Sequence, residues 1–210
     1  MNIIRAQFLF DFGSPNAYLC HKVLPDIESR TGVTFEYLPI LLGGLFKLTN
    51  NRSPAEAFAH IANKRAYDTL EVRRFIARHE LHDFRPNQYF PVNTLLIMRG
   101  AVAAQKIGCF DRYVDTVFAC MWERNLNMAE VDVVSASLKA AGLDADAILA
   151  ATREDEVKSR LLLNTQGAHD RGAFGSPTFF VDQEIFFGKD RLREVEEEIR
   201  KQVAEPSAPK

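Results

Sequence analysis

Residues 6–24 read AQFLFDFGSPNAYLCHKVL, and this stretch decides the fold. Up to Phe12 every second residue is apolar, which is typical of a β-strand. From Cys20 the apolar residues recur at intervals of three and four, and Gly32 follows them, so we expect an amphipathic helix that ends near this glycine. Residues 33–38 then read as a second strand. A β-α-β unit of this kind places its two strands parallel, with a right-handed crossover.

The chain changes character after about residue 42 and is predicted to be helical up to about residue 165. Ser53, followed by Pro54 and then Glu56, forms a capping box with proline at the first helical position. Gly108 and Gly142 follow apolar-periodic segments and mark the ends of helices. Helices are accordingly predicted over residues 53–79 with a break near Tyr67, 92–107, 110–124, 129–141 and 144–170.

Strand patterns return near the C-terminus. Residues 178–181 and 184–187 are short runs of aromatic and β-branched residues joined by two polar ones, which favours a hairpin, and an amphipathic helix starts at Leu192. The order β-α-β, helices, β-β-α predicts an α/β protein with a thioredoxin-like fold, a four-stranded mixed sheet and a large inserted helical subdomain. The predicted units are residues 1–41 plus 172–203 for the thioredoxin-like domain, 42–171 for the inserted all-helical subdomain and 204–210 for a flexible tail.

Composition narrows the possible partners. The net charge of −2 and the pI of about 6.2 give no basic surface for nucleic acid or an anionic membrane, so we expect a small-molecule partner. No run approaches the roughly 18 apolar residues of a membrane span, and the N-terminus lacks a signal-peptide pattern, so the protein is expected to be cytoplasmic. Cys20, Cys109 and Cys120 form no CxxC and no metal-ligand spacing, which argues against zinc, any other bound metal and structural disulfides.

Ser14 stands at the junction between the first strand and the helix. Serine before proline at such a junction is an ordinary N-cap, and spacing alone favours this interpretation. A functional role is compatible with it, because a helix N-terminus carries unpaired N–H groups and partial positive charge that stabilise an anion such as a thiolate. No G-x-S-x-G motif surrounds Ser14, which argues against a hydrolase nucleophile. Ser14 and Ala17 occupy the two sulfur positions of a CxxC motif, which excludes a redox role here.

Two further segments carry candidate groups. Ser176-Pro177 opens the third predicted strand, and statistics alone favour a turn or edge-strand proline. A cis proline there would instead leave the backbone of Ser176 free to pair with a peptide-like ligand. Asp190 precedes the last helix and is most simply a helix cap with Arg191 as a solvated charge, yet its carboxylate would face the α-amino group of a ligand.

Six motifs occur in order along the chain between residues 11 and 192, and they carry a resemblance to a known family that covers residues 3–200. They are DFGSPNAY (11–18), NNRSP (50–54), NKRAY (63–67), YFPVN (89–93), GAFGSPTFFV (172–181) and FFGKDRL (186–192). Each motif is weak singly, but the ordered set is specific. In these motifs and their order the chain resembles the 2-hydroxychromene-2-carboxylate isomerases. These enzymes are classified with the kappa-class glutathione transferases in the DsbA-like branch of the thioredoxin fold.

The resemblance implies glutathione as the cofactor and Ser14 as the catalytic residue, which stabilises the thiolate of bound glutathione. It implies that Ser176, the residue before a cis Pro177, pairs its backbone with the cysteinyl part of glutathione. The matching residues at the γ-glutamyl end are Lys189, Asp190 and, beside them, Arg191.

The resemblance also implies a substrate side. Lys47 matches a lysine that serves the substrate carboxylate, Asn51 an asparagine that reaches glutathione or substrate, and Arg52 a substrate-side arginine. Asn16 departs from the family, where an aromatic residue usually walls the pocket at this position. The identity of the substrate is therefore left open by Asn16, whereas glutathione binding is not affected.

The implied activity is a glutathione-dependent conversion of 2-hydroxychromene-2-carboxylate, or a related aromatic pyruvate adduct, to trans-o-hydroxybenzylidenepyruvate in aromatic hydrocarbon catabolism. Reversible thiolate addition makes a double bond single, permits rotation and is undone by elimination, so glutathione is not consumed. The resemblance further implies a homodimer. Two alternatives stay open: a kappa-like glutathione S-transferase that forms net conjugates, and a non-catalytic thioredoxin-fold binding module.

Overall fold

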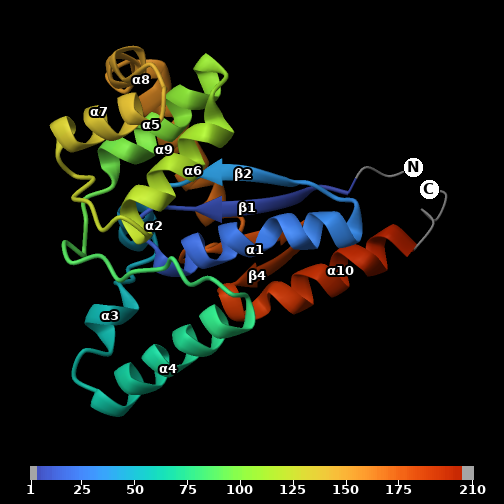
Figure 1. Cartoon of the computed structure of the whole chain (residues 1–210). Coiled ribbons are helices and arrows are strands. Elements are labelled where there is room, and N and C mark those ends of the chain that lie inside the picture. Colours follow the sequence, from blue (N-terminus) through green and yellow to red (C-terminus); the bar gives the residue numbers. More distant parts are fainter. Residues whose placement is uncertain (1–3, 205–210) are drawn as a thin grey trace.

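The computed structural model describes residues 4–204 and has a four-stranded sheet at its centre (Figure 1). The strand order is β2-β1-β3-β4, formed by β1 (Ala6–Phe10), β2 (Phe35–Pro39), β3 (Thr178–Val181) and β4 (Glu184–Phe187). β1 runs parallel to β2 and antiparallel to β3, and β3 pairs with β4 in a hairpin. The prediction of a mixed sheet, with a parallel pair from one end of the chain and a hairpin from the other, is confirmed.

Helices occupy most of the chain between β2 and β3 and also follow β1 and β4. The first helix ends where the sequence predicts, because Gly32 adopts the left-handed conformation (φ 71°) that a side chain would disfavour. The helices are α1 (Pro15–Thr31), α2 (Leu42–Leu48), α3 (Pro54–Ala57), α4 (Ala62–Arg78), α5 (Leu95–Ile107), α6 (Phe110–Trp122), α7 (Val131–Ala140), α8 (Ala145–Ala151), α9 (Asp155–Asp170), the short 3₁₀ helix η1 (Lys189–Arg191) and α10 (Leu192–Ala204).

The segment predicted as one broken helix over residues 53–79 is two helices, and the prediction of a break near Tyr67 is wrong. α3 ends after one turn, and the Ile61 N–H donates to the Phe58 carbonyl (2.9 Å) in the turn that separates α3 from α4. α4 runs through Tyr67 without interruption, because good helix formers such as Ala66 flank it.

Two other stretches differ from the prediction. Residues 144–170 form two helices, α8 and α9, because the Thr152 hydroxyl donates to the Leu149 carbonyl (2.7 Å) and Glu154 is extended (φ −68°, ψ 140°). The sequence does not predict α2 as a separate helix, since two glycines lower its helix propensity. Its buried Leu45 packs against the sheet, so tertiary packing stabilises a helix that the local sequence does not.

The two faces of the sheet are covered by different helices. Phe8 and Phe10 of β1 join the large core cluster with residues of α1 and α10, which run side by side (Figure 1). Leu9 points to the opposite face and packs with Leu45 of α2 and Ala168 of α9. The alternation along β1 therefore buries both faces, which is why this strand is buried at every position.

The predicted division at residues 41/42 and 171/172 stays a prediction. α2 and α9, which it assigns to the inserted subdomain, pack on the same sheet face as Leu9. The predicted tail, residues 204–210, lies outside the described residues apart from Ala204, which ends α10.

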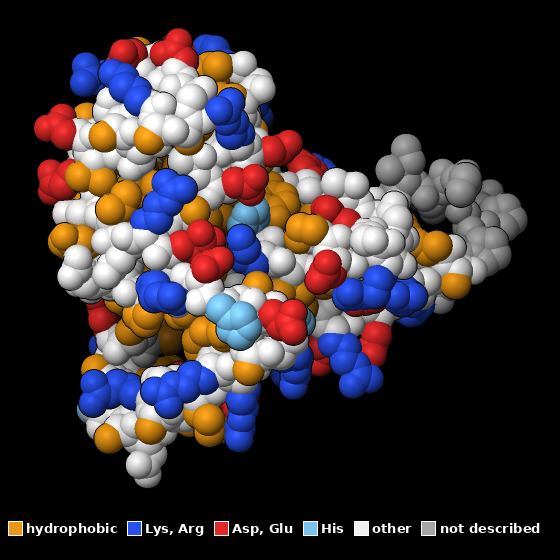
Figure 2. Space-filling view, viewed as in Figure 1, with side chains coloured by type: hydrophobic (Ala, Val, Ile, Leu, Met, Phe, Trp, Pro, Cys, Tyr) orange, Lys and Arg blue, Asp and Glu red, His pale blue; other side chains and the backbone are white. Residues whose placement is uncertain are grey.

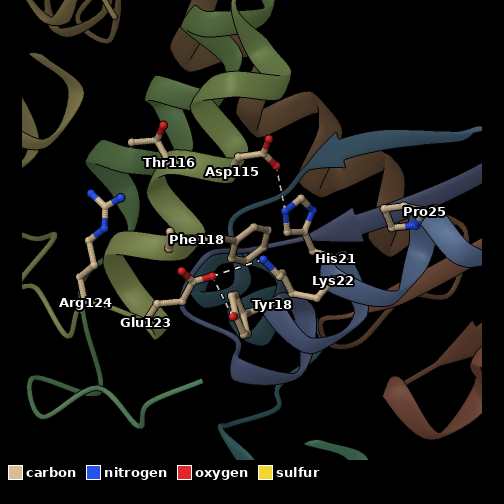
Figure 3. Close-up of a pocket in the computed structure, with 10 residues that line it drawn as sticks. Tyr18, His21, Lys22, Pro25, Asp115, Thr116, Phe118, Glu123 and Arg124 are labelled. Carbon is tan, nitrogen blue, oxygen red and sulfur yellow. Dashed lines mark hydrogen bonds and ion pairs between the residues drawn. The ribbon is translucent and has the colours of Figure 1, made fainter. Parts of the chain in front are cut away.

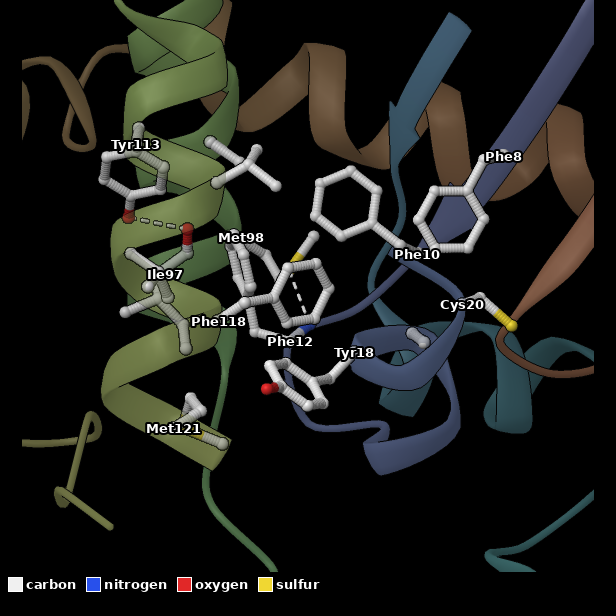
Figure 4. Packing of buried hydrophobic residues seen from close by; sticks show 14 of the residues in the cluster. Phe8, Phe10, Phe12, Tyr18, Cys20, Ile97, Met98, Tyr113, Phe118 and Met121 are labelled. Atoms are coloured by element: carbon white, nitrogen blue, oxygen red, sulfur yellow. Dashed lines mark hydrogen bonds between the residues drawn. The ribbon is translucent and has the colours of Figure 1, made fainter. Parts of the chain in front are cut away.

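Phe12, directly after β1, joins the sheet to the helices between β2 and β3 (Figure 4). Its ring meets Phe118 of α6 edge-on, with 4.8 Å between the ring centroids. The Phe12 N–H donates to the Met98 sulfur of α5 (3.4 Å), and its carbonyl accepts from the Trp122 indole N–H of α6 (2.8 Å). The residue two positions before Ser14 is thereby fixed to α5 and α6.

An ion pair joins α1 to α10. The Arg30 guanidinium donates two hydrogen bonds to the Glu196 carboxylate, at 2.9 and 2.7 Å. The hydrogen bonds from Arg30, helped by Arg200, lower the pKa of Glu196 to about 2. Glu196 is largely buried whereas Arg30 is about half exposed, so solvent screens part of this attraction.

Replacing Arg30 by Gln is expected to lower the free energy of unfolding by about 1 kcal/mol at pH 7. Because the pKa of Glu196 is depressed in the folded state, its stabilisation is present above the unfolded pKa and is lost as the pH falls toward 2. Urea denaturation should show the difference between wild type and variant shrinking from about pH 4 to about pH 2. Arg193→Gln, which removes a highly exposed pair with Glu197, is the control and should change stability less. An Arg30→Gln effect that stays constant over this pH range would contradict the assignment.

Candidate functional site

Ser14 begins α1, as predicted, and is its N-cap. The Ser14 hydroxyl oxygen accepts from the Ala17 N–H (3.2 Å), and Pro15 occupies the first helical position. The Ser14 N–H donates to the Asp11 carbonyl (3.0 Å), which closes the turn after β1. Ser14 is only 5% exposed, so its orientation is fixed by these contacts.

Ser176 meets Ser14 although 162 positions separate them in the sequence. The Ser14 hydroxyl donates to the Ser176 carbonyl oxygen (2.9 Å), and the Ser176 hydroxyl oxygen accepts from the Asp11 N–H (3.1 Å). The peptide bond between Ser176 and Pro177 is cis. The structure therefore brings together the two serines that were candidates on sequence grounds and has the cis proline that the family resemblance implies.

Unpaired backbone donors surround this contact. Among the described residues, neither the Ser176 N–H nor the Asn16 N–H at the start of α1 has a hydrogen-bond acceptor. The Asn16 side-chain oxygen is also buried with no partner in that part of the chain. A polar ligand can supply what these groups lack, and the N-terminus of α1 favours a negatively charged one.

Asp190 lies close to the same loop. The Gly188 N–H donates to the Pro177 carbonyl (3.0 Å), which fixes the start of η1 beside the serine contact. The Asp190 side chain is 68% exposed and pairs with the ammonium group of Lys189, which is 4% exposed. The Asp190 carboxylate is thus accessible to a cationic group of a ligand.

Lys189 and Arg191 point in different directions. The Lys189 ammonium lies over the ring of Phe75 in α4, 5.2 Å from its centroid, so it links η1 to α4. Arg191 is exposed and pairs with Glu194 in α10 (2.8 Å). Of the three candidates in η1, Asp190 therefore presents the most accessible polar group.

Asn51 contacts the same loop. Its side-chain amide donates to the Phe174 carbonyl (3.2 Å), two residues before Ser176. Arg52 and Lys47 are exposed, and within residues 4–204 neither side chain forms an ion pair. Asn51 therefore contacts the site directly. Lys47 lies four positions before Asn51 in the chain, and Arg52 directly follows it.

The segment that carries these residues is positively charged. Residues 47–78 contain seven Lys or Arg and three Asp or Glu, a net charge of +4 in a chain whose net charge is −2. Figure 2 shows Lys and Arg side chains gathered over α3 and α4. This part of the surface favours an anionic small molecule.

A groove of about 540 Å³ lies elsewhere, between α1 and α6 (Figure 3). Its polar side chains already bind one another: His21 pairs with Asp115 (3.0 Å), and the Tyr18 hydroxyl donates to Glu123 (2.9 Å). His21 also contacts the Tyr37 hydroxyl at 3.0 Å. We interpret these contacts as structural interactions that join α1 to α6, because the polar groups satisfy one another without a ligand.

Sequence reasoning missed two features of the site. Asp11, which directly follows the first strand, is fully buried and accepts hydrogen bonds from three donors. The available signal was an acidic residue at the end of an aromatic strand, three positions before a helix cap. Phe174 and Phe187 form a partly exposed aromatic pair beside Asn51, with ring centroids 4.5 Å apart.

The described residues limit other kinds of chemistry. No group of three or more His, Cys, Asp or Glu within residues 4–204 is arranged to hold a metal ion. No helix in that range is long and apolar enough to cross a bilayer. Cys20 is fully buried, and burial raises the pKa of its thiol well above the usual value.

A family model described as a DsbA-like thioredoxin domain matches residues 6–200. The chain is 28% identical to a 2-hydroxychromene-2-carboxylate isomerase of Sphingobium xenophagum over 189 residues, covering 89% of this chain and 93% of that protein. It is 26% identical to glutathione S-transferase kappa 1 of Caenorhabditis elegans, with 90% and 87% covered. A solved structure of a 2-hydroxychromene-2-carboxylate isomerase has a TM-score of 0.78 at 23% identity, over 94% of this chain and 95% of that one. The predicted thioredoxin-like fold of the DsbA type is confirmed.

Ser14→Ala is expected to lower the free energy of unfolding by about 1–2 kcal/mol, because it removes both the cap of α1 and the donor to the Ser176 carbonyl. Ser53→Ala is the matched control, since Ser53 is also a serine cap before proline but starts a one-turn helix at the surface. Ser53→Ala should lower the free energy of unfolding by about 0.5 kcal/mol, at the low end of the range for a lost cap. Chemical denaturation of both variants checks this, and equal losses would show that the contact with Ser176 adds nothing.

Proposed function

Since the chain belongs to the DsbA-like thioredoxin family, we propose that it is a glutathione-dependent isomerase. The proposed reaction converts 2-hydroxychromene-2-carboxylate, or a related aromatic pyruvate adduct, to trans-o-hydroxybenzylidenepyruvate in aromatic hydrocarbon catabolism. The observation that carries the proposal is the contact between Ser14 and Ser176 at the N-terminus of α1, in a chain whose relatives include isomerases of this name.

The residues present fit glutathione. The unpaired Ser176 N–H suits the backbone of a peptide, and the cis Pro177 follows it. The exposed Asp190 carboxylate suits an α-amino group, with Lys189 and Arg191 on the same turn as further candidates for the γ-glutamyl end. The three cysteines of the chain are not needed, because bound glutathione supplies a thiolate that adds reversibly to the conjugated double bond.

Ser14 has one hydroxyl proton and donates it to the Ser176 carbonyl. Rotation of this hydroxyl redirects the proton toward a sulfur anion and leaves the Ser176 carbonyl free to accept from a ligand N–H. The Asn16 N–H and the positive end of α1 stabilise the same anion. Ser14 is therefore proposed as the catalytic residue that lowers the pKa of the bound thiol.

The substrate side is proposed for Lys47, Asn51, Arg52 and Asn16. The net charge of +4 over residues 47–78 supports an anionic substrate, and the exposed pair of Phe174 and Phe187 supports an aromatic one. Lys47 and Arg52 are free to bind a carboxylate, since neither forms an ion pair within the described residues. A homodimer in the cytoplasm is part of the proposal and rests on the family resemblance and composition alone.

A kappa-like glutathione transferase is the second candidate, because relatives at 24–26% identity carry that name. The two differ in what happens to glutathione: an isomerase releases it unchanged, and a transferase keeps it in a conjugate. The purified protein should convert 2-hydroxychromene-2-carboxylate only when glutathione is added, with no loss of free thiol. Stoichiometric thiol loss with an electrophile such as 1-chloro-2,4-dinitrobenzene, without isomerisation, would instead support the transferase. Failure to bind glutathione by calorimetry would refute both.

Ser14→Ala should raise the pKa of the bound thiol by about one to two units, since a hydrogen bond to a charged group contributes about 1.5–3 kcal/mol. Thiolate absorbance against pH in the glutathione complex measures this pKa. Ser14→Thr keeps the hydroxyl and should keep most of the effect. An unchanged titration in Ser14→Ala would remove Ser14 from its proposed role.

A further inference from the structure

Asp11 is a buried carboxylate that the proposed reaction does not use. Its side chain is 0% exposed, and no positively charged group of the described residues pairs with it. Three donors surround it instead. The Gly13 N–H binds Oδ1 at 2.8 Å, the Leu42 N–H binds Oδ2 at 2.8 Å, and the Thr94 hydroxyl binds Oδ2 at 3.1 Å.

Burial and hydrogen bonding act on Asp11 in opposite directions. Removal from water raises the pKa of the Asp11 carboxyl and outweighs the hydrogen bonds from Leu42, Gly13 and Thr94, which lower it. Burying a carboxylate without hydrogen-bond donors costs much free energy. Moving any one of the three donors away from Asp11 is therefore unfavourable. The carboxylate therefore constrains the segments that supply its donors.

Each donor belongs to a different segment of the candidate site. Gly13 precedes Ser14 in the turn after β1, Leu42 is the first residue of α2, and Thr94 is the residue before α5. α2 leads directly into the segment of Asn51 and Arg52. Through its backbone, Asp11 also holds the cis-proline loop, since its N–H donates to the Ser176 hydroxyl oxygen at 3.1 Å.

We infer that Asp11 is a positioning residue of the Ser14 site, whose carboxylate fixes the Ser14 turn to the starts of α2 and α5. The inference rests on the contacts of the ligand-free chain; only its consequence for a bound thiol rests on the proposed function.

The close packing of the turn disfavours a side chain at Gly13, and the three donors disfavour another residue type at Asp11. A side-chain carbon on Gly13 would lie 3.0 Å from the Thr94 methyl group and 3.3 Å from Asp11 Oδ1, so the turn packs closely on the carboxylate. All three partners are hydrogen-bond donors, and an ionised carboxylate can accept hydrogen bonds with both of its oxygens. Asparagine has nearly the same shape but one acceptor, and its NH₂ group would face at least one of these donors.

The first experiment uses the ligand-free protein. Amide hydrogen exchange by NMR should show the Gly13 and Leu42 N–H groups exchanging about tenfold faster or more in Asp11→Asn than in wild type. Asp144→Asn is the matched control, because Asp144 also accepts a backbone N–H, that of Ala147 (3.0 Å), at the start of α8. It should leave Gly13 and Leu42 unchanged. Unchanged exchange in folded Asp11→Asn would overturn the inference.

Thr94 provides a milder variant in case Asp11→Asn does not fold. Thr94→Val removes one donor while keeping the shape, and Thr94 makes no capping bond to α5 that would be lost at the same time. Thr94→Val should speed exchange at Gly13 and Leu42, and Thr94→Ser should restore wild-type rates. Equal rates in the Val and Ser variants would also overturn the inference.

The second experiment measures the thiol pKa of bound glutathione. If Asp11 acts by positioning Ser14, Asp11→Asn should raise this pKa by about one unit, in the direction of Ser14→Ala, and the double variant should add little to Ser14→Ala alone. An unchanged thiol pKa would mean a purely structural role, and a lowered one would mean that Asp11 acts through its charge; either overturns the inference. If wild type binds no glutathione, the proposed function fails, and the exchange experiment still decides the role of Asp11.

Discussion

The burial of the turn after β1 is the constraint on which the site depends. Phe12 is held by the Met98 sulfur and the Trp122 indole, and the Asp11 carboxylate is satisfied by three donors. Neither residue can move without exposing a polar group to the core or opening a cavity beside Phe118. Ser14 follows within three positions of Asp11, so its location relative to the sheet is set by packing that lies beneath it.

The same constraint explains how distant segments build one site. The cis-proline loop leads into the C-terminal hairpin, far from β1 in the sequence, yet Asp11 and Ser14 both bind Ser176. A DsbA-like fold of this kind offers a helix N-terminus and a backbone edge at the same point, which suits a peptide-like thiol whether or not the chain has its own cysteine there. Under the proposed function the reactive sulfur at this point belongs to a ligand, because the turn of Ser14 and Ala17 contains no cysteine.

The sequence predicts those parts of the structure that local rules determine. The first strand, the Ser14 cap and the end of the first helix near Gly32 are set by residues close to each other in the sequence, and all three are confirmed. The helix α2 depends on tertiary contacts such as that of Leu45, and no local pattern contains it. The burial of Asp11 was missed for the same reason, because its donors come from residues 42 and 94 as well as its own turn.

Lys189 shows why burial can matter more than residue type in assigning a role. A motif containing Lys189 and Asp190 reads as two ligand-binding groups, but only the carboxylate is exposed. The Lys189 ammonium neutralises that carboxylate and lies over Phe75, the one buried residue of α4. A cationic group that binds Asp190 therefore competes with the ammonium that contacts α4. Binding of a ligand at the proposed γ-glutamyl end would thus affect the contact between Lys189 and α4, the helix that carries much of the positive charge around the proposed substrate side.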